Sequence, residues 1–210
     1  RDGAKPSYTW NCGVEGATRR SQVLALRLRQ MKNALSFLFL SQGTPLLFMG
    51  DEFGNTQKGN NNPYCQDNDV SWLNWNHASK WRDLTEFMKT LISLRKTHPI
   101  LHMSEPFQMT DYRSLGFPDL SFHGLEPWRP DFSGNSRFLG LLYCGAYAQD
   151  TTFYIAINMD WRTKYYALPR LPQAQVWKFL MSTHAEVPEG SKEEQTIPPR
   201  SIVIYICDRF

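Results

Sequence analysis

The feature that most constrains the fold of this 210-residue chain is a four-residue apolar run, 46–49, between two amphipathic segments. In the first, residues 21–41, apolar positions recur at helical spacing: Val23, Leu24, Leu28, Met31, Leu35 and Leu38. The second spans about Ser79 to Thr97, with Ser79 as the expected N-cap and Pro99 as the stop. The run between them predicts a strand buried on both faces.

A parallel strand needs neighbouring strands and covering helices, so it cannot exist in isolation. Helix, strand, loop and helix therefore predict that residues 1–100 are the last part of a larger α/β domain. Because a complete (β/α)8 barrel takes roughly 250 residues, most of such a barrel is expected to lie outside this chain. The start at Arg1, without Met or a leader, likewise suggests a truncated or processed N-terminus.

Residues 101–210 show a different pattern, in which short alternating or aromatic runs are separated by proline- and glycine-containing turns. The expected strands are 137–144, 151–158, 165–168, 176–181 and 201–207. This half predicts an antiparallel β-sandwich domain. The expected fold class is thus α/β plus all-β.

Composition excludes several functional classes. A formal net charge of +3 without a long basic run gives little support to nucleic-acid binding. The sequence has no apolar segment of 18 residues, so no membrane span is expected. The four cysteines lie far apart and outside metal-ligand spacing, which favours reduced, partly buried thiols and no metal or cofactor.

The loop after the predicted strand, residues 50–75, is crowded with carboxylates, amides and aromatic rings. Amides and a carboxylate can bond vicinal sugar hydroxyls, and an aromatic ring can pack against a pyranose face. The substrate-binding candidates are Asp67, Gln66, Tyr64, Asn61, Asn62, Trp72 and, in the first loop, Trp10. The competing interpretation is that Asn and Asp favour turns and that the tryptophans anchor a core.

Four segments carry a resemblance to bacterial glycogen debranching enzymes and isoamylases of the α-amylase family. RDGAKPSYTWNCGVEGATRR (1–20) resembles the loop after the seventh barrel strand, although Thr9 stands where the family has Ser. LSQGTPLLFMGDEFG (40–54) resembles the eighth strand and its mouth, and GNNNPYCQDNDVSWLNW (59–75) resembles the loop that follows. SFHGLEPWRPDFSGNSRFLGLLYCG (121–145) resembles the start of the C-terminal β-domain.

The resemblance implies hydrolysis of α-1,6 branch linkages in glycogen or limit dextrin, with retention of configuration, in the cytoplasm. Retention requires a carboxylate nucleophile and a carboxylic acid roughly 5 Å apart. In the family these groups follow earlier barrel strands, so no catalytic residue is expected in this chain. The implied partners are a branched α-glucan and the upstream barrel segment of the same polypeptide.

Asp51 and Glu52 are not expected to be the catalytic pair, because adjacent strand residues point to opposite faces. We expect them to support the cleft floor through hydrogen bonds. Two alternatives remain: a stand-alone α-glucan-binding or regulatory module, and a structural partner that completes a barrel from another chain.

Overall fold

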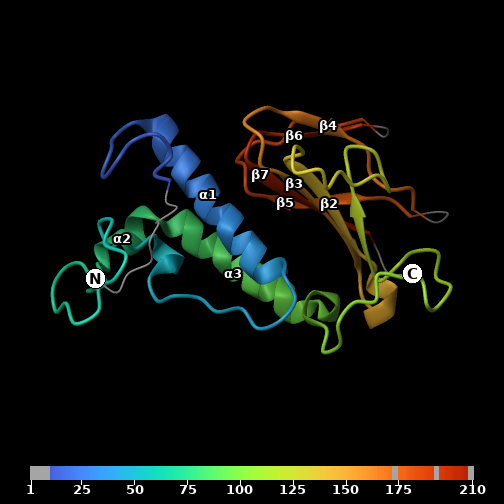
Figure 1. Ribbon diagram of the computed structural model, residues 1–210, viewed down its shortest axis with the longest axis horizontal. Helices are drawn as coiled ribbons and strands as arrows, with labels where there is room; N and C mark the ends of the chain where they lie inside the picture. The colour runs from blue at the N-terminus through green and yellow to red at the C-terminus, as the bar shows by residue number, and fades with distance from the viewer. Residues whose placement is uncertain (1–9, 172–174, 192–193, 208–210) are drawn as a thin grey trace.

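The computed structural model describes residues 10–171, 175–191 and 194–207. A helical part comes first along the chain and an antiparallel sheet part follows, and the two lie side by side (Figure 1). None of the described helices is long and apolar enough to cross a membrane.

Two long helices form the first part: α1, Ser21–Leu40, and α3, Arg82–Thr97. Their apolar faces meet in a cluster of buried side chains: Leu35, Phe39, Leu84, Phe87, Met88 and Leu91. Three shorter helices belong to the same part: η1 (Asp51–Phe53), α2 (Asn76–Lys80) and η2 (Pro99–His102).

The expected helix over 79–97 is interrupted. Trp81, with φ −108° and ψ 28°, separates α2 from α3. Ser79 lies inside α2 and its hydroxyl donates to the carbonyl of Asn76, so the prediction that it caps the long helix is wrong. The helix breaks where the Trp81 ring packs closely against Gly54 of the preceding segment.

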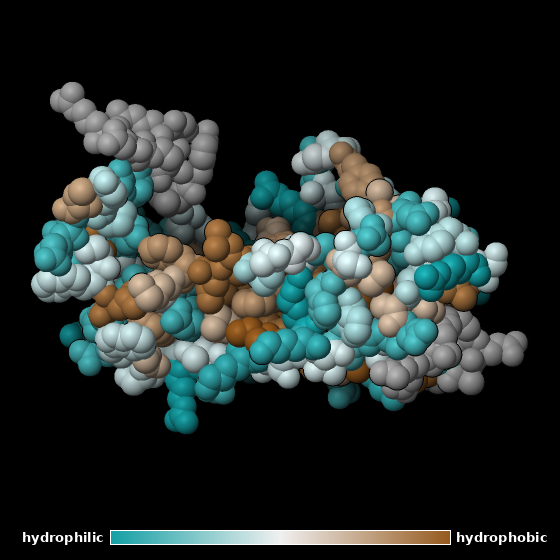
Figure 2. Space-filling view, turned by 90° about the horizontal axis from the view of Figure 1, so that it is seen from below, coloured by the Kyte–Doolittle hydropathy of each residue, from teal (hydrophilic) through white to brown (hydrophobic). Residues whose placement is uncertain are grey.

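The predicted strand over 46–49 is also wrong. These residues have no strand partner, and Leu46, Phe48 and Met49 are 89%, 59% and 67% exposed. A strand requires a neighbour to satisfy its backbone groups, and the described residues place no second strand beside this segment. Figure 2 shows apolar side chains gathered over the helical half, on the face where this segment runs.

The sheet part confirms the predicted antiparallel topology. One sheet has the order β1-β2-β3-β7-β5, and a second pairs β4 with β6, all antiparallel. The strands are β1 Leu120–His123, β2 Phe138–Tyr143, β3 Thr152–Asn158, β4 Lys164–Tyr166, β5 Lys178–Ser182, β6 Gln195–Ile197 and β7 Ser201–Cys207. A short helix, η3 (Gly145–Ala148), joins β2 to β3. β1 and β6 were not predicted.

Both faces of the large sheet carry buried side chains. On one face Tyr166 of β4 and Ile197 of β6 pack against Tyr154 and Val203. The second layer of the expected sandwich is therefore only two short strands. On the other face, Leu40 at the end of α1 and Ile100 of η2 join the sheet residues in a second cluster.

A buried arginine fixes the ends of the two long helices. The Arg95 guanidinium donates to the carbonyls of Phe39, Ser41, Gly43 and Leu101. Burial lowers the pKa of Arg95 from its usual value. Because these carbonyls follow or end the helices, one side chain satisfies groups that helix termini leave without partners.

Three of the cysteines, Cys12, Cys144 and Cys207, are buried, and Cys65 is exposed. Burial raises the pKa of the Cys12 and Cys144 thiols.

Candidate functional site

The loop between η1 and α2 is shaped by its own asparagines. The side-chain oxygen of Asn60 accepts from the backbone N–H of Asn62 at 2.9 Å, and that of Asn62 accepts from Tyr64 at 3.2 Å. Side-chain bonds two residues along the chain are the usual reason why Asn nucleates turns. The loop conformation therefore follows directly from the run of amides.

Gln66 closes the same loop. Its amide nitrogen donates to the Asn62 carbonyl at 3.0 Å, and its amide oxygen accepts from Asn60 at 3.4 Å. Two predicted sugar-binding amides, Asn62 and Gln66, thus have structural partners in the loop. Asn61, which precedes Asn62 in the sequence, is exposed.

Asp67 and Trp72 are brought together at the exposed end of the loop. The Trp72 indole N–H donates to Asp67 Oδ1 at 2.8 Å, and the Trp72 side chain remains 58% exposed. Tyr64 is 79% exposed. A carboxylate held in place beside exposed aromatic rings is the arrangement needed to grip both the hydroxyls and the face of a sugar.

Asp51 and Glu52 serve the turn that begins the loop. Glu52 Oε2 accepts from the Gly50 N–H at 2.8 Å, and the Glu52 carbonyl accepts from Thr85 of α3 at 2.8 Å. Gly50 has φ 101°, a conformation that suits glycine. Burial raises the pKa of Asp51. A hydrogen bond with the Phe48 backbone opposes this increase, and the negative charge of Glu52 adds to it.

Trp10 lies in a different neighbourhood. Its ring is 4.8 Å from the Arg200 guanidinium, which belongs to the turn between β6 and β7, and its side chain is 54% exposed. Arg27 of α1 donates to the carbonyls of Asn11 and Val14 and so holds the loop that carries Trp10. The sequence pattern did not single out Arg200, because an arginine after Pro198-Pro199 has no motif of its own.

Two histidines have structural partners. His98 Nδ1 is 2.8 Å from Asp150 Oδ1. His123 is fully buried, accepts the Trp128 backbone N–H at Nδ1 (2.9 Å) and lies 2.9 Å from the Ser121 hydroxyl through Nε2. Burial lowers the pKa of His123 to about 4.

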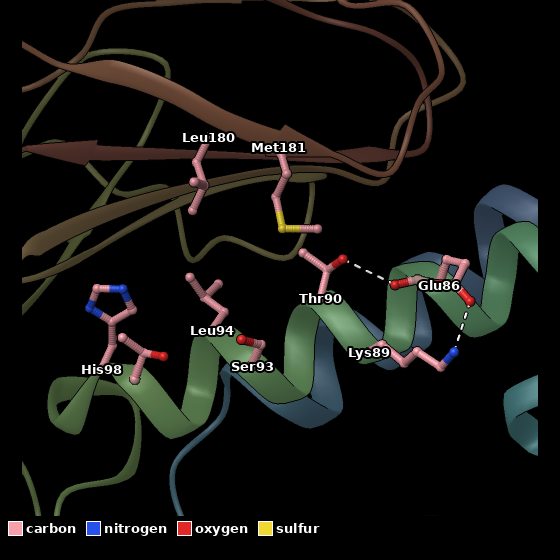
Figure 3. A pocket seen from close by; sticks show the side chains of 9 residues that line it. Glu86, Lys89, Thr90, Ser93, Leu94, His98, Leu180 and Met181 are labelled. Carbon is pink, nitrogen blue, oxygen red and sulfur yellow. Dashed lines mark hydrogen bonds and ion pairs between the residues drawn. The ribbon is translucent and has the colours of Figure 1, made fainter.

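An open groove of about 510 Å³ separates α3 from β5, away from the polar loop. Figure 3 shows Leu94 of α3, and His98 just after that helix, facing Leu180 and Met181 of β5 across it. The Glu86–Lys89 ion pair closes one end of the groove. Among the described residues, no three His, Cys, Asp or Glu side chains lie close enough together to hold a metal ion.

Similar proteins cover the chain. The chain is 32% identical over 213 residues to isoamylase 1 of rice. This alignment covers 100% of the present chain and 25% of the rice protein. It is 46% identical over 114 residues to the glycogen operon protein GlgX homologue of Mycobacterium tuberculosis, which covers 54% of this chain and 16% of that protein. It is 45% identical over 111 residues to the glycogen debranching enzyme of Pectobacterium carotovorum. This alignment covers 53% of the present chain and 17% of that enzyme. No protein-family model matches.

Solved structures share the fold. The pullulanase of Bacillus acidopullulyticus has a TM-score of 0.66 at 20% identity and covers 90% of this chain and 22% of its own. A pullulanase of Paenibacillus barengoltzii in complex with maltohexaose and α-cyclodextrin has a TM-score of 0.63 at 20% identity, covering 91% and 26%. The chain spans about a quarter or less of the length of these relatives.

Proposed function

We propose, from the premise that this chain belongs to the glycogen debranching enzymes and isoamylases of the α-amylase family, that it is part of a glycoside hydrolase. The proposed reaction is cleavage of α-1,6 branch linkages in glycogen or a related α-glucan, with retention. The observation that carries the proposal is the similarity to an isoamylase over the whole chain. We place the protein in the cytoplasm.

In this proposal the chain supplies a wall of the cleft, and the catalytic carboxylates come from another part of the protein. Retaining hydrolysis needs two carboxyl groups about 5 Å apart on opposite sides of the scissile bond. Asp51 and Glu52 do not offer that arrangement, because the Glu52 carboxylate is folded back onto the Gly50 N–H. We assign both to cleft support.

Residues 1–100 are proposed to complete a (β/α)8 barrel, and residues 101–210 to form the β-domain attached to it. The exposed side chains of Leu46, Phe48 and Met49 support this division. Apolar side chains clustered on one short segment mark a surface that another part of a protein covers.

The substrate contacts are assigned to Asp67, Tyr64 and Asn61. Asp67 is the strongest candidate because the Trp72 N–H fixes its carboxylate while the loop keeps it exposed. Gln66 and Asn62 also remain assigned to substrate binding, in addition to their bonds within the loop. Trp10 is proposed to contact the glucan from the first loop.

The test is Asp67→Ala in the full-length protein that carries this chain, assayed on glycogen and limit dextrin by the release of reducing ends. We expect the KM to rise about ten- to a hundredfold, because a hydrogen bond to a charged group contributes about 1.5–3 kcal/mol. Asp69→Ala is the matched control. Its carboxylate pairs with Lys58 on the same loop, and such an exposed pair contributes little.

Unchanged kinetics of Asp67→Ala on both substrates would remove Asp67 from the site. A full-length wild-type protein that releases no chains from either glucan would contradict the proposed function itself.

A further inference from the structure

We propose that Arg200 positions Trp10 for glucan contact, so that the sheet part of the molecule shapes the substrate site. This inference rests on the proposed function. It starts from the 4.8 Å separation between the Arg200 guanidinium and the Trp10 ring. A cation over an indole face is attracted by the negative face of the ring and favours one ring orientation.

Trp10 remains accessible in that arrangement. Its side chain is 54% exposed, which leaves ring surface for a pyranose to pack against. The cation therefore orients the ring without burying it. An exposed tryptophan without such a contact would have to be ordered at the moment of binding, at a cost in side-chain entropy.

The backbone of Arg200 is held from two sides. Its N–H donates to the Asp160 carbonyl at 2.9 Å, and its carbonyl accepts from Asn33 of α1 at 2.9 Å. Asn33 is only 2% exposed. Arg200 also adopts φ 49°, which is unfavourable for a residue with a side chain and persists where the surroundings impose it.

The turn around Arg200 and the loop around Trp10 are tied to the same helix. Arg29 of α1 donates to the Pro199 carbonyl at 2.7 Å, next to Arg200. Arg27, two residues earlier in α1, holds the loop that carries Trp10 through the Asn11 carbonyl. α1 runs beside β7 (Figure 1), so the helix sets the spacing between guanidinium and indole.

A positioning role predicts a particular kinetic effect. Trp10 would bind the glucan equally in the ground state and the transition state, because it is a binding contact without a chemical task. Loss of its positioning should therefore raise the KM and leave kcat close to the wild-type value. The exposed cation–π contact corresponds to about a two- to five-fold change in KM.

The experiment uses the full-length protein and glycogen. Arg200→Asn removes the cation, and Asn tolerates a positive φ, so the turn is kept. We expect the KM to rise about two- to five-fold with kcat unchanged. Arg200→Lys keeps a cation and should return the KM toward the wild-type value. Arg129→Asn is the control, because Arg129 is exposed and pairs only with Glu126 at the surface.

A double-mutant cycle with Trp10→Ala identifies the route of the effect. If Arg200 acts through Trp10, adding Arg200→Asn to Trp10→Ala leaves the KM of the single Trp10 variant unchanged. Additive effects, or a KM for Arg200→Asn equal to wild type, would overturn the inference. Arg200→Gln carries the same expectation and replaces Arg200→Asn if that variant does not fold.

The two proposals fail differently. If the wild-type protein does not debranch glycogen, the proposed function is wrong. If it does and the cycle is additive, only the role of Arg200 is wrong.

Discussion

At the scale of single residues, His123 shows how a buried polar group can be satisfied in only one protonation state. Its Nδ1 accepts from the Trp128 N–H, so the proton of the neutral ring is on Nε2, facing the Ser121 hydroxyl. Protonation would set a second N–H against the Trp128 donor. This geometry and the burial of the ring agree with the lowered pKa, about 4.

The free energy of unfolding should therefore fall on acidification from pH 6.5 to 4. In that window the unfolded chain binds a proton at His123 and the folded chain does not, so stability rises with pH. The total change is up to about 3 kcal/mol, from 1.36 kcal/mol per pKa unit. Urea unfolding of His123→Asn across this range should lose that part of the slope. The exposed His102→Asn serves as the control, and an unchanged slope in His123→Asn would contradict the prediction.

The residue types of the candidate loop were predictable, but their partners were not. Amides, a carboxylate and aromatic rings in one loop already indicate sugar chemistry. That Asn62 and Gln66 bond each other while Asp67 bonds Trp72 depends on backbone torsions within the loop. Arg95 and Arg200 act through carbonyls or rings far away in the sequence, and such long-range contacts leave no local pattern.

At the scale of elements, the junction between η1 and the α2–α3 break depends on one glycine. Gly54 has φ 64°, and a Cβ there would lie 2.9 Å from the Trp81 ring. Gly59, in the same loop, has φ 83° with open space around it. Both positions carry the same torsional preference, but only Gly54 has a packing constraint.

Gly54→Ala should therefore destabilise the protein more than Gly59→Ala. The torsional penalty is about 1–2 kcal/mol at either site, and the clash adds about 1–3 kcal/mol at Gly54 only. Chemical unfolding of the two variants gives the difference directly. Equal losses of stability would mean that the Trp81 ring moves aside without cost.

Elements with a long, regular pattern were predicted well. Helix α1 and strands β3 and β7 lie within one residue of the expected bounds, because their periodicity or β-branched content extends over many residues. Strands β1 and β6 were missed because they are three or four residues long and contain polar residues. The predicted strand at 46–49 failed for another reason, because no strand of the described residues pairs with this segment.

At the scale of the whole molecule, the exposed apolar segment predicts opposite effects in two contexts. Replacing Leu46 and Phe48 by Gln should make the isolated 210-residue chain more soluble, because it removes exposed apolar surface. The same double change should destabilise the full-length protein, by about 1.5–3 kcal/mol for each side chain that is buried there.

The measurements are light scattering of the isolated chain and thermal unfolding of the full-length protein. Val176→Gln, also exposed but outside this segment, should change neither. If the double variant left the full-length protein as stable as the wild type, then no other part of that protein would bury Leu46 and Phe48.

The strand order also has a consequence for protein synthesis. β7 is the last described strand along the chain, yet it lies between β3 and β5. On the ribosome, β1, β2 and β3 can pair as they emerge, but β5 has no neighbour until residues 201–207 follow. At roughly 5–20 residues per second, that interval lasts some seconds. During this interval the edge of β3 that will pair with β7 keeps its backbone N–H and C=O groups unpaired, and other nascent chains can bind them. A chaperone would therefore be most useful at this stage of synthesis.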